Sequence, residues 1–405
     1  MEFTNLMITY NYKRSGFGNI CVTDSKFTAN SEDKIVVNCE NLLAYPGLIN
    51  IHDHLVGNWL PKVAPNRPYK NTSRWVEEMR DTEPLIERKK FWKSNDLSNL
   101  AKGNGINLAI LGVYKNIFSG VVVIQDHVPV QKDEYYKRLP INVISKYQQG
   151  HSITLKNWWG GDDLETEIKK TDENTPFVIH IAEGTDKEAK EEFRKFTEMG
   201  LLKENVILVH CTALTRDEFK QIADTGTSIA WCPNSNVYLL DTTLDFKTVL
   251  DLGINMSIGT DSTLSGSLNL LDELSYTTKT FPNLSDAQLF KMVTENPARA
   301  LKLPDYNGKI EIGKNANLLL TKKNFDDPYK NLVNLETKDI ELLLYKGIPV
   351  FGKVEFLKYF SWDAKKYYLF DYHDTKRFVI GHPEKILQKI EKSLGYKKVL
   401  DYMLF

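Results

Sequence analysis

A short apolar run near the start of the chain ends in two histidines one residue apart. Residues 46–55 read PGLINIHDHL, so the run LINI leads into His52, Asp53 and His54. Alternate side chains of a β-strand lie on the same face, so His52 and His54 are expected to point the same way and Asp53 away from them. Imidazole is a common zinc ligand, and two such rings on one strand end form half of a metal site.

Three later strand-like runs end in side chains that bind metals or move protons. They read FVIHIAE, VILVHC and MSIGTD, and they carry, in this order, His180 with Glu183, His210, and Asp261. Catalytic zinc takes about three or four protein ligands and keeps a position for water, whose pKa falls from about 15.7 toward 7. Such chemistry also needs an acid that carries a proton from the water to the leaving group. Glu183 fits that role, and His210 can orient the water and stabilise charge on the adduct.

Strand-like runs and amphipathic helical stretches alternate from residue 46 to residue 304. Near-continuous apolar runs such as VVVIQD, INVIS and SIAWCP suit parallel strands buried on both faces. Charged helical stretches at 185–199 and 215–224 lie between them, each followed by a glycine close to its end. This alternation predicts a (β/α)8 barrel, in which reactive side chains lie at the C-terminal strand ends. On this basis we expect one shared metal site with four ligands: His52, His54, His180 and Asp261.

One part of the barrel is short of residues. A helix, a fourth strand and another helix are expected between Ser145 and Phe177, where about 30 residues are available. We expect GHSITL, residues 150–155, to be the fourth strand, with a reduced connection before it.

The segments on either side of the barrel read as β structure with glycine turns. Residues 1–45 and 305–350 can pair into one small β-sandwich domain, so that the barrel of residues 46–304 is inserted between its halves. Residues 351–405 form an aromatic, lysine-rich extension with a helix expected from Pro383 to Leu394. No chemistry is evident in this extension.

Composition excludes several classes of protein. The 405 residues carry a formal net charge of -1, so there is no basic footprint for nucleic acid or an anionic membrane. The first residues lack a charged region followed by an apolar one, so we expect no signal peptide there, and no apolar run approaches the roughly 18 residues of a membrane helix. The cysteines are scattered without a C-x-x-C pair, which indicates a reduced, cytoplasmic protein: Cys21, Cys39, Cys211 and Cys232. We expect a small-molecule substrate and a homo-oligomer, most simply a dimer.

The order of these motifs resembles that of a known superfamily. H-x-H after PGLIN, followed by HIAE, VHC, CPNSN and GTDS, resembles the amidohydrolase superfamily over residues from about 20 to about 350. The closest resemblance is to its mononuclear aminohydrolase branch, which includes guanine, S-adenosylhomocysteine and cytosine deaminases and the triazine hydrolases. It implies one divalent ion, zinc or sometimes iron, on the four expected ligands. It also implies that Glu183 protonates a ring nitrogen, that His210 contacts water or substrate, and that Asp261 accepts a proton from the attacking water.

Other polar and aromatic residues are candidates for binding the substrate. His127 ends the second strand and either lines the pocket or packs beside it. Trp75 belongs to a group of tryptophans that could stack on a planar heterocycle or lie in the core. Asn236, in CPNSN, either shapes a loop through backbone hydrogen bonds or contacts the substrate. The expected substrate contacts are therefore these three residues and His210.

Two alternatives to a mononuclear deaminase remain open at this stage. In binuclear relatives a carboxylated lysine on the fourth strand bridges two metals, and Lys156 in SITLKN could do so in a peptidase-like or lactonase-like hydrolase. The pairing of His180 with Glu183 favours the mononuclear form. A catalytically silent, oligomeric scaffold is the second alternative, although none of the expected ligands is missing. Our hypothesis is hydrolytic deamination of an aminated purine, pyrimidine, pterin or triazine; the zinc deaminases with H-x-E and P-C-x-x-C are excluded because neither motif occurs.

Overall fold

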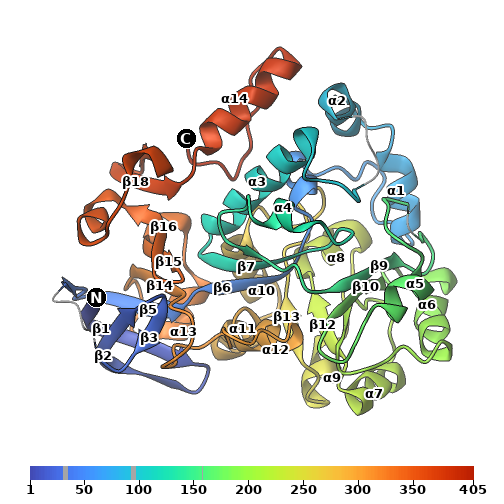
Figure 1. Cartoon of the computed structure of the whole chain (residues 1–405). Helices are drawn as coiled ribbons and strands as arrows, with labels where there is room; N and C mark the ends of the chain where they lie inside the picture. Colours follow the sequence, from blue (N-terminus) through green and yellow to red (C-terminus); the bar gives the residue numbers. More distant parts are fainter. Residues whose placement is uncertain (31–34, 93–96, 157) are drawn as a thin grey trace.

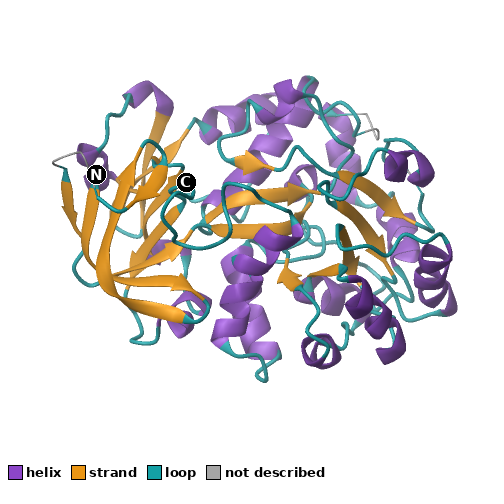
Figure 2. Ribbon diagram, turned by 60° about the horizontal axis from the view of Figure 1, so that its bottom comes forward, coloured by secondary structure: helices purple, strands orange, loops and turns teal. Residues whose placement is uncertain are grey.

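The structure, a computed structural model, describes residues 1–30, 35–92, 97–156 and 158–405. Residues 31–34, 93–96 and 157 lie outside this description. Figure 1 shows a strand-rich region that contains the N-terminus beside a larger region of alternating strands and helices, and Figure 2 separates the two regions more clearly.

Eight consecutive parallel strands form the wall of the larger region. They lie in two sheets, one with the order β6-β7-β8 and one with the order β13-β12-β11-β10-β9. Their bounds are β6 Leu48–Asp53, β7 Val121–Asp126, β8 Asn142–Val143, β9 Gln148–Ser152, β10 Phe177–Ile181, β11 Val206–His210, β12 Ser228–Trp231 and β13 Met256–Ile258. Every residue of β10 and β11 is buried, as expected for parallel strands covered on both faces. The predicted (β/α)8 class is confirmed, in a barrel whose wall consists of two arcs.

The first and last strands meet through the backbone of the first histidine. The carbonyl of His52 accepts hydrogen bonds from the backbone N–H groups of Thr260 and Asp261, both at 3.1 Å. This close approach needs glycine at position 259, because a Cβ there would lie 2.8 Å from the Cβ of His52 and 2.9 Å from its carbonyl oxygen. On the other side of the barrel, the Tyr147 hydroxyl bridges the arcs by donating to the carbonyl of Asp126 at 3.0 Å.

Helices surround the barrel and connect its strands. Those between β6 and β10 are η1 Leu55–Trp59, α1 Thr72–Met79, α2 Glu83–Phe91, α3 Gly103–Ile117, α4 Asp133–Tyr136 and α5 Leu164–Lys169. Those after β10 are α6 Lys187–Glu198, α7 Arg216–Thr225, α8 Pro233–Leu240, α9 Phe246–Asp251, α10 Leu270–Thr280, α11 Asp286–Met292 and α12 Glu295–Ala300. The helices expected at 185–199 and 215–224 correspond to α6 and α7, and α7 has a capping box between Thr215 and Glu218. No helix separates β8 from β9, so the connection before the fourth strand is reduced, and that strand begins at Gln148.

Strands from both ends of the chain form one ten-stranded sheet. The N-terminal members are β1 Glu2–Asn11, β2 Arg14–Thr23, β3 Lys26–Thr28, β4 Val36–Asn38 and β5 Leu42–Pro46. The C-terminal members are β14 Leu318–Lys322, β15 Ile340–Tyr345, β16 Ile348–Lys353, β17 Tyr367–Tyr372 and β18 Thr375–Ile380. The two groups join where β5 pairs antiparallel with β14, with Ala44 opposite Leu320. The extension after residue 350 therefore adds two strands to a sheet that the rest of the chain begins.

The remaining elements lie near the end of the chain. They are α13 Pro328–Val333, η2 Thr337–Asp339, η3 Val354–Tyr359, η4 Ala364–Lys366 and α14 Pro383–Leu394, and α14 has the bounds that the sequence predicts. Helix α14 contacts α3 and α2, so the extension reaches back to the barrel (Figure 1). Among the described residues, no helix combines the length and apolar character that a membrane span requires.

The contact between Gly259 and His52 gives a test of how the barrel closes. We expect Gly259→Ala to lower the free energy of unfolding by about 1–3 kcal/mol, because the added methyl group must push β13 away from β6. Gly16→Ala is the control, since a Cβ there meets nothing within 4 Å. Urea denaturation measures both variants, and equal stabilities would contradict the tight junction.

Candidate active site

The two histidines of the first strand lie on one side of its C-terminal end. His52 and His54 have ring centroids 4.8 Å apart, in an edge-on arrangement. Asp53 points away from them and forms a fully buried ion pair with Lys115 of α3, whose Nζ lies 3.2 Å from Oδ1. The alternation of side chains along β6 thus separates a histidine face from an anchoring carboxylate.

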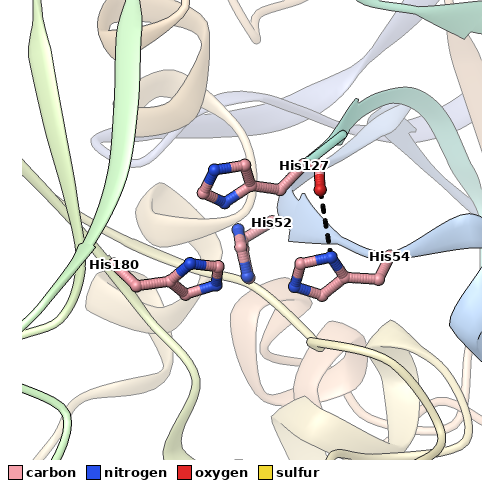
Figure 3. A group of neighbouring side chains, drawn as sticks. All are labelled: His52, His54, His127 and His180. Atoms are coloured by element: carbon pink, nitrogen blue, oxygen red, sulfur yellow. Dashed lines mark hydrogen bonds between the residues drawn. The ribbon is translucent and has the colours of Figure 1, made fainter. Parts of the chain in front are cut away.

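Four histidines gather here, two on the strands β6 and β10 and two directly after β6 and β7 (Figure 3). His52, His54, His127 and His180 each offer one ring nitrogen such that these nitrogens all lie within 4.8 Å of one another. The ring of His180, on β10, stacks on that of His127, just after β7, with centroids 4.4 Å apart. Such a cluster of imidazoles suits a divalent metal ion.

Backbone carbonyls fix the orientation of two of these rings. His54 Nδ1 lies 3.1 Å from the carbonyl oxygen of His127, and His180 Nδ1 lies 2.8 Å from that of His151. A hydrogen bond donated by Nδ1 sets the tautomer and leaves the lone pair on Nε2. Both rings therefore present Nε2 as the free donor atom for a metal.

His52 supplies the observation that tests the fit of a metal. Its side chain is fully buried, yet neither ring nitrogen has a hydrogen-bond partner among the described residues. Burial, together with the neighbouring imidazoles of His54 and His127, holds the pKa of His52 well below its ordinary value. A buried neutral imidazole with unsatisfied nitrogens costs free energy unless a ligand takes its lone pair, so these residues fit a metal ion.

Asp261 brings a carboxylate to the same cluster from the end of β13. Its Oδ1 lies 3.6 Å from His54 Nε2, and its Oδ2 accepts hydrogen bonds from the hydroxyls of Ser235 at 2.8 Å and Ser265 at 2.9 Å. Although burial opposes ionisation, His54, His210 and the hydroxyl of Ser235 together keep the pKa of Asp261 below its ordinary value. The structure thus brings the four ligands expected from the sequence together.

His127 lies within the histidine cluster. The side chain is fully buried, and Nε2 lies 3.1 Å from the carbonyl oxygen of Gly150. It is absent from the residues that line the pocket and lies among the ligand histidines instead. The ring of His127 therefore packs within the histidine cluster beside Gly150 of β9, and its contact with substrate stays a prediction.

Glu183 and His210 form an acid–base pair beside the cluster. Glu183 Oε1 lies 3.6 Å from His210 Nε2, and both side chains are buried. Burial raises the pKa of Glu183, against the opposing influence of His210. A buried carboxyl with a raised pKa can hold and release a proton near neutral pH.

Asn236 acts on the site through His210. Its Oδ1 lies 2.7 Å from His210 Nδ1, and its side chain is fully buried behind the ring and away from the pocket. This contact orients His210 and leaves its Nε2 facing Glu183, while a direct substrate contact by Asn236 stays a prediction. The alternative that CPNSN is a loop-shaping motif agrees with these contacts, because the neighbouring Ser235 binds Asp261.

Four residues at the strand ends that carry the site have a left-handed backbone conformation. Ala182, His210, Cys211 and Asp261 all have positive φ, with values of 55°, 71°, 54° and 54°. This left-handed region is uncommon for residues other than glycine and is retained where the surroundings hold it. Around Ala182 the restraint comes from Glu192, whose Oε2 accepts the backbone N–H of Ala182 at 3.0 Å.

The cluster opens into a pocket of about 420 Å³. One part of its wall is apolar and aromatic, and that part includes Trp75, Met79, Leu97, Trp158 and Trp159. Trp75 was expected to contact substrate and does line the pocket, with Nε1 donating to the carbonyl of Val63 at 2.7 Å. Flat, apolar walls next to charged groups suit a planar heterocycle.

Comparisons with known proteins agree with this geometry. A model of the amidohydrolase family matches residues 163–349. A 5-methylthioadenosine/S-adenosylhomocysteine deaminase of Pyrococcus furiosus is 31% identical over 394 residues, which cover 80% of this chain and 87% of the relative. The chain belongs to the amidohydrolase family. An enzyme of Moorella thermoacetica with the same name is 28% identical over 324 residues, covering 70% of this chain and 74% of that enzyme.

Solved structures share the fold of this amidohydrolase. A zinc-bound adenosine deaminase from Xanthomonas campestris has a TM-score of 0.64 at 17% identity, covering 86% of this chain and 93% of that one. Atrazine chlorohydrolase from Arthrobacter aurescens, in complex with zinc, has a TM-score of 0.66 at 19% identity, with coverage of 86% and 94%. The predicted superfamily is confirmed, as is the prediction of a hydrolase that acts on carbon–nitrogen bonds outside peptides.

Lys156 lies outside the histidine cluster of the amidohydrolase. It follows β9, has a φ of 50°, and its side chain is exposed to solvent. A lysine that bridges two metals must reach the buried ligands, and Lys156 is not among the residues that line the pocket. Its position therefore disfavours the binuclear alternative.

Two residues near the site were missed in the sequence. His151, in the fourth strand, lines the pocket with its ring centroid 3.9 Å from that of Trp159, and burial lowers its pKa to about 3. Its place at the end of a barrel strand was the signal that could have identified it. Lys115 carries no comparable signal, because it lies in the last turn of α3, where a lysine is common.

The ligand set gives a prediction about metal content. We expect the zinc-loaded protein to hold about one ion per chain and His180→Ala to lose most of it, because a ligand from β10 is removed. His373→Ala, in an exposed turn between β17 and β18, is the control. Elemental analysis after dialysis against a weak chelator measures this; full metal content in His180→Ala would contradict the assignment.

Proposed function

We propose that this amidohydrolase is a metal-dependent deaminase of adenine nucleosides of the methylthioadenosine or S-adenosylhomocysteine type. The observation that carries the proposal is the pair of Glu183 and His210, whose Oε1 and Nε2 atoms lie 3.6 Å apart. Both side chains line the aromatic pocket next to the histidine cluster. Relatives from Pyrococcus furiosus and Moorella thermoacetica carry these two substrates in their names. A Helicobacter pylori aminofutalosine deaminase of the same fold, with a TM-score of 0.59, was solved with methylthio-coformycin.

One divalent ion, which we take to be zinc, would be held by His52, His54, His180 and Asp261. When bound, such an ion lowers the pKa of a water molecule toward about 7 and so supplies a nucleophile at neutral pH. Asp261 is placed to accept the first proton from the attacking water. Its hydrogen bonds from Ser235 and Ser265 hold Oδ2 and leave Oδ1 facing His54 Nε2, 3.6 Å away.

Glu183 is placed to deliver a proton to the ring nitrogen beside the carbon that is attacked. Its raised pKa favours the protonated form that this step requires. Thr72 fixes the segment by donating its backbone N–H to the carbonyl of Glu183 at 3.1 Å. His210, oriented by Asn236, lies where it can stabilise charge on the oxygen of the tetrahedral adduct.

The lining of the pocket also carries charge. It includes Arg80, Arg88 and Lys89, together with Asp81. A substrate with an aromatic base and a carboxylate would match both kinds of lining. S-adenosylhomocysteine has such a carboxylate, whereas methylthioadenosine does not.

The other expectations from the sequence carry less support. The exposed position of Lys156 disfavours a binuclear hydrolase, and the assembled ligand set disfavours a silent scaffold. Residence in the cytoplasm and a dimeric state stay predictions.

Replacing the proposed proton carrier tests the reaction. We expect Glu183→Gln to lower kcat for release of ammonia from methylthioadenosine by about 10²–10⁴-fold, because the amide cannot carry the proton. Metal content should stay near that of the wild type, since Glu183 is not among the proposed ligands. Glu173→Gln, at an exposed position, is the control. Full activity of Glu183→Gln would remove this residue from the mechanism.

The cationic side chains that line the pocket predict a difference in KM between the two substrates. We expect Arg88→Ala to raise KM for S-adenosylhomocysteine by about tenfold, the loss of one charge-assisted hydrogen bond, while KM for methylthioadenosine changes little. Arg194→Ala, an exposed arginine on α6, is the control. Steady-state kinetics with both nucleosides measures the effect, and an equal rise in both KM values would exclude recognition of the carboxylate.

A further inference from the structure

Helix α2 forms part of the outer wall of the substrate pocket but is weakly anchored by apolar contacts. Leu85, Arg88 and Lys89 line the pocket, and their spacing places them along one side of the helix. Leu85 is the buried residue of α2, whereas a helix held by the core usually buries a wider apolar stripe. Half-buried Phe91 also packs on Trp59, with ring centroids 5.1 Å apart, and polar contacts add to these two apolar ones in holding the helix against the barrel.

Glu87 supplies a polar anchor on the other side of the helix. Its Oε1 accepts hydrogen bonds from Trp59 Nε1 at 3.1 Å and from Lys398 Nζ at 2.7 Å. Its Oε2 accepts one from the Tyr396 hydroxyl at 2.5 Å. Two of these three donors belong to the last ten residues of the chain, so α2 is tied to the C-terminal tail.

The ion pair between Glu87 and Lys398 is shielded from solvent. The side chains of Lys398 and Glu87 are 16% and 13% exposed, and Lys398 Nζ lies 5.3 Å from the centroid of the Trp59 ring. A partly buried ion pair whose carboxylate accepts several hydrogen bonds keeps one geometry far better than an ion pair on the exposed surface. The pair can therefore fix the position of the helix.

The tail that carries these donors is itself fixed at both ends. Before it, Ile390 of α14 is fully buried, and the backbone N–H of Lys398 donates to Glu391 Oε1 at 2.8 Å. After it, Leu400 and Tyr402 are buried in the same core as the barrel. Burial raises the pKa of Tyr402, whose ring lies close enough to Asp53 for the charge of that carboxylate to contribute.

We propose that the C-terminal tail, through Tyr396 and Lys398, holds helix α2 in place as a wall of the substrate pocket, with Glu87 as the positioning residue. A segment beyond the family match at residues 163–349 is then part of the apparatus that binds substrate. The inference rests on the proposed function only in taking this pocket as the substrate site. Loosening α2 displaces Leu85, Arg88 and Lys89 from the bound molecule and leaves the catalytic pair of Glu183 and His210 untouched.

Three variants test the proposal: Glu87→Gln, Lys398→Met and the double variant. We expect each single change to raise KM for S-adenosylhomocysteine by about 3–10-fold, with kcat within about twofold of the wild type and the same metal content. The double variant should be no worse than the poorer single one, because both changes remove one shared interaction. Glu198→Gln, which removes an exposed ion pair with Arg194 on α6, should leave KM unchanged.

Hydrogen exchange supplies a readout that does not depend on turnover. We expect the amides of α2 to exchange at least about tenfold faster in Lys398→Met than in the wild type, while those of α6 keep their rates. A merely structural role for the tail would lower kcat and thermal stability together without a selective rise in KM. Unchanged exchange in α2 overturns the inference however KM behaves, and faster exchange with unchanged KM shows that α2 does not serve the pocket. If S-adenosylhomocysteine is not turned over at all, the proposed function fails while the exchange measurement still decides this point.

Discussion

A buried ion pair beneath the histidine cluster connects the beginning and the end of the barrel. Lys115, fully buried on α3, donates to Asp53 Oδ1 at 3.2 Å, to Thr260 Oγ1 at 3.0 Å and to the carbonyl of Asp261 at 2.8 Å. Removing two charges from water costs several kcal/mol per ion, and only such a full set of hydrogen bonds offsets that cost. The lysine therefore fixes β6 and the end of β13 in one relative position, which is the position in which His54 and Asp261 meet.

The same burial sets the chemistry of the side chains above that pair. Because water is excluded, the histidines are neutral and offer lone pairs, whereas Asp261 stays ionised through its charged and hydroxyl neighbours. Glu183 lacks such a set of donors, so burial moves its pKa in the opposite direction. Two carboxylates in one pocket are thus given different tasks by their surroundings, one as an anionic acceptor and one as a proton carrier.

The sequence predicted those parts of the site that depend on local periodicity. The ends of apolar runs marked His52, His180, His210 and Asp261, because in a parallel barrel every strand end opens on the same face. Contacts between strands were beyond such reasoning. The contact of His127 with Gly150 of β9 and that of Asn236 with His210 join separate elements, and neither follows from spacing along the chain. Lys115 was hidden for the same reason, since its partners are 62 and 145 residues away in sequence.

The extension after residue 350, in which the sequence shows no chemistry, contacts helix α2 of the pocket wall. Helix α2 lies in the long connection after β6, and the tail after α14 follows the last strand of the ten-stranded sheet. Loops after barrel strands vary in a family because the strands beneath them carry the scaffold, so substrate selection can change there without disturbing the metal ligands. A loop that buries little apolar surface needs an external support to keep a defined shape. In this amidohydrolase the end of the chain supplies that support, and the specificity of the site thereby becomes a property of residues more than 300 positions apart, as the separation of 309 between Tyr396 and Glu87 shows.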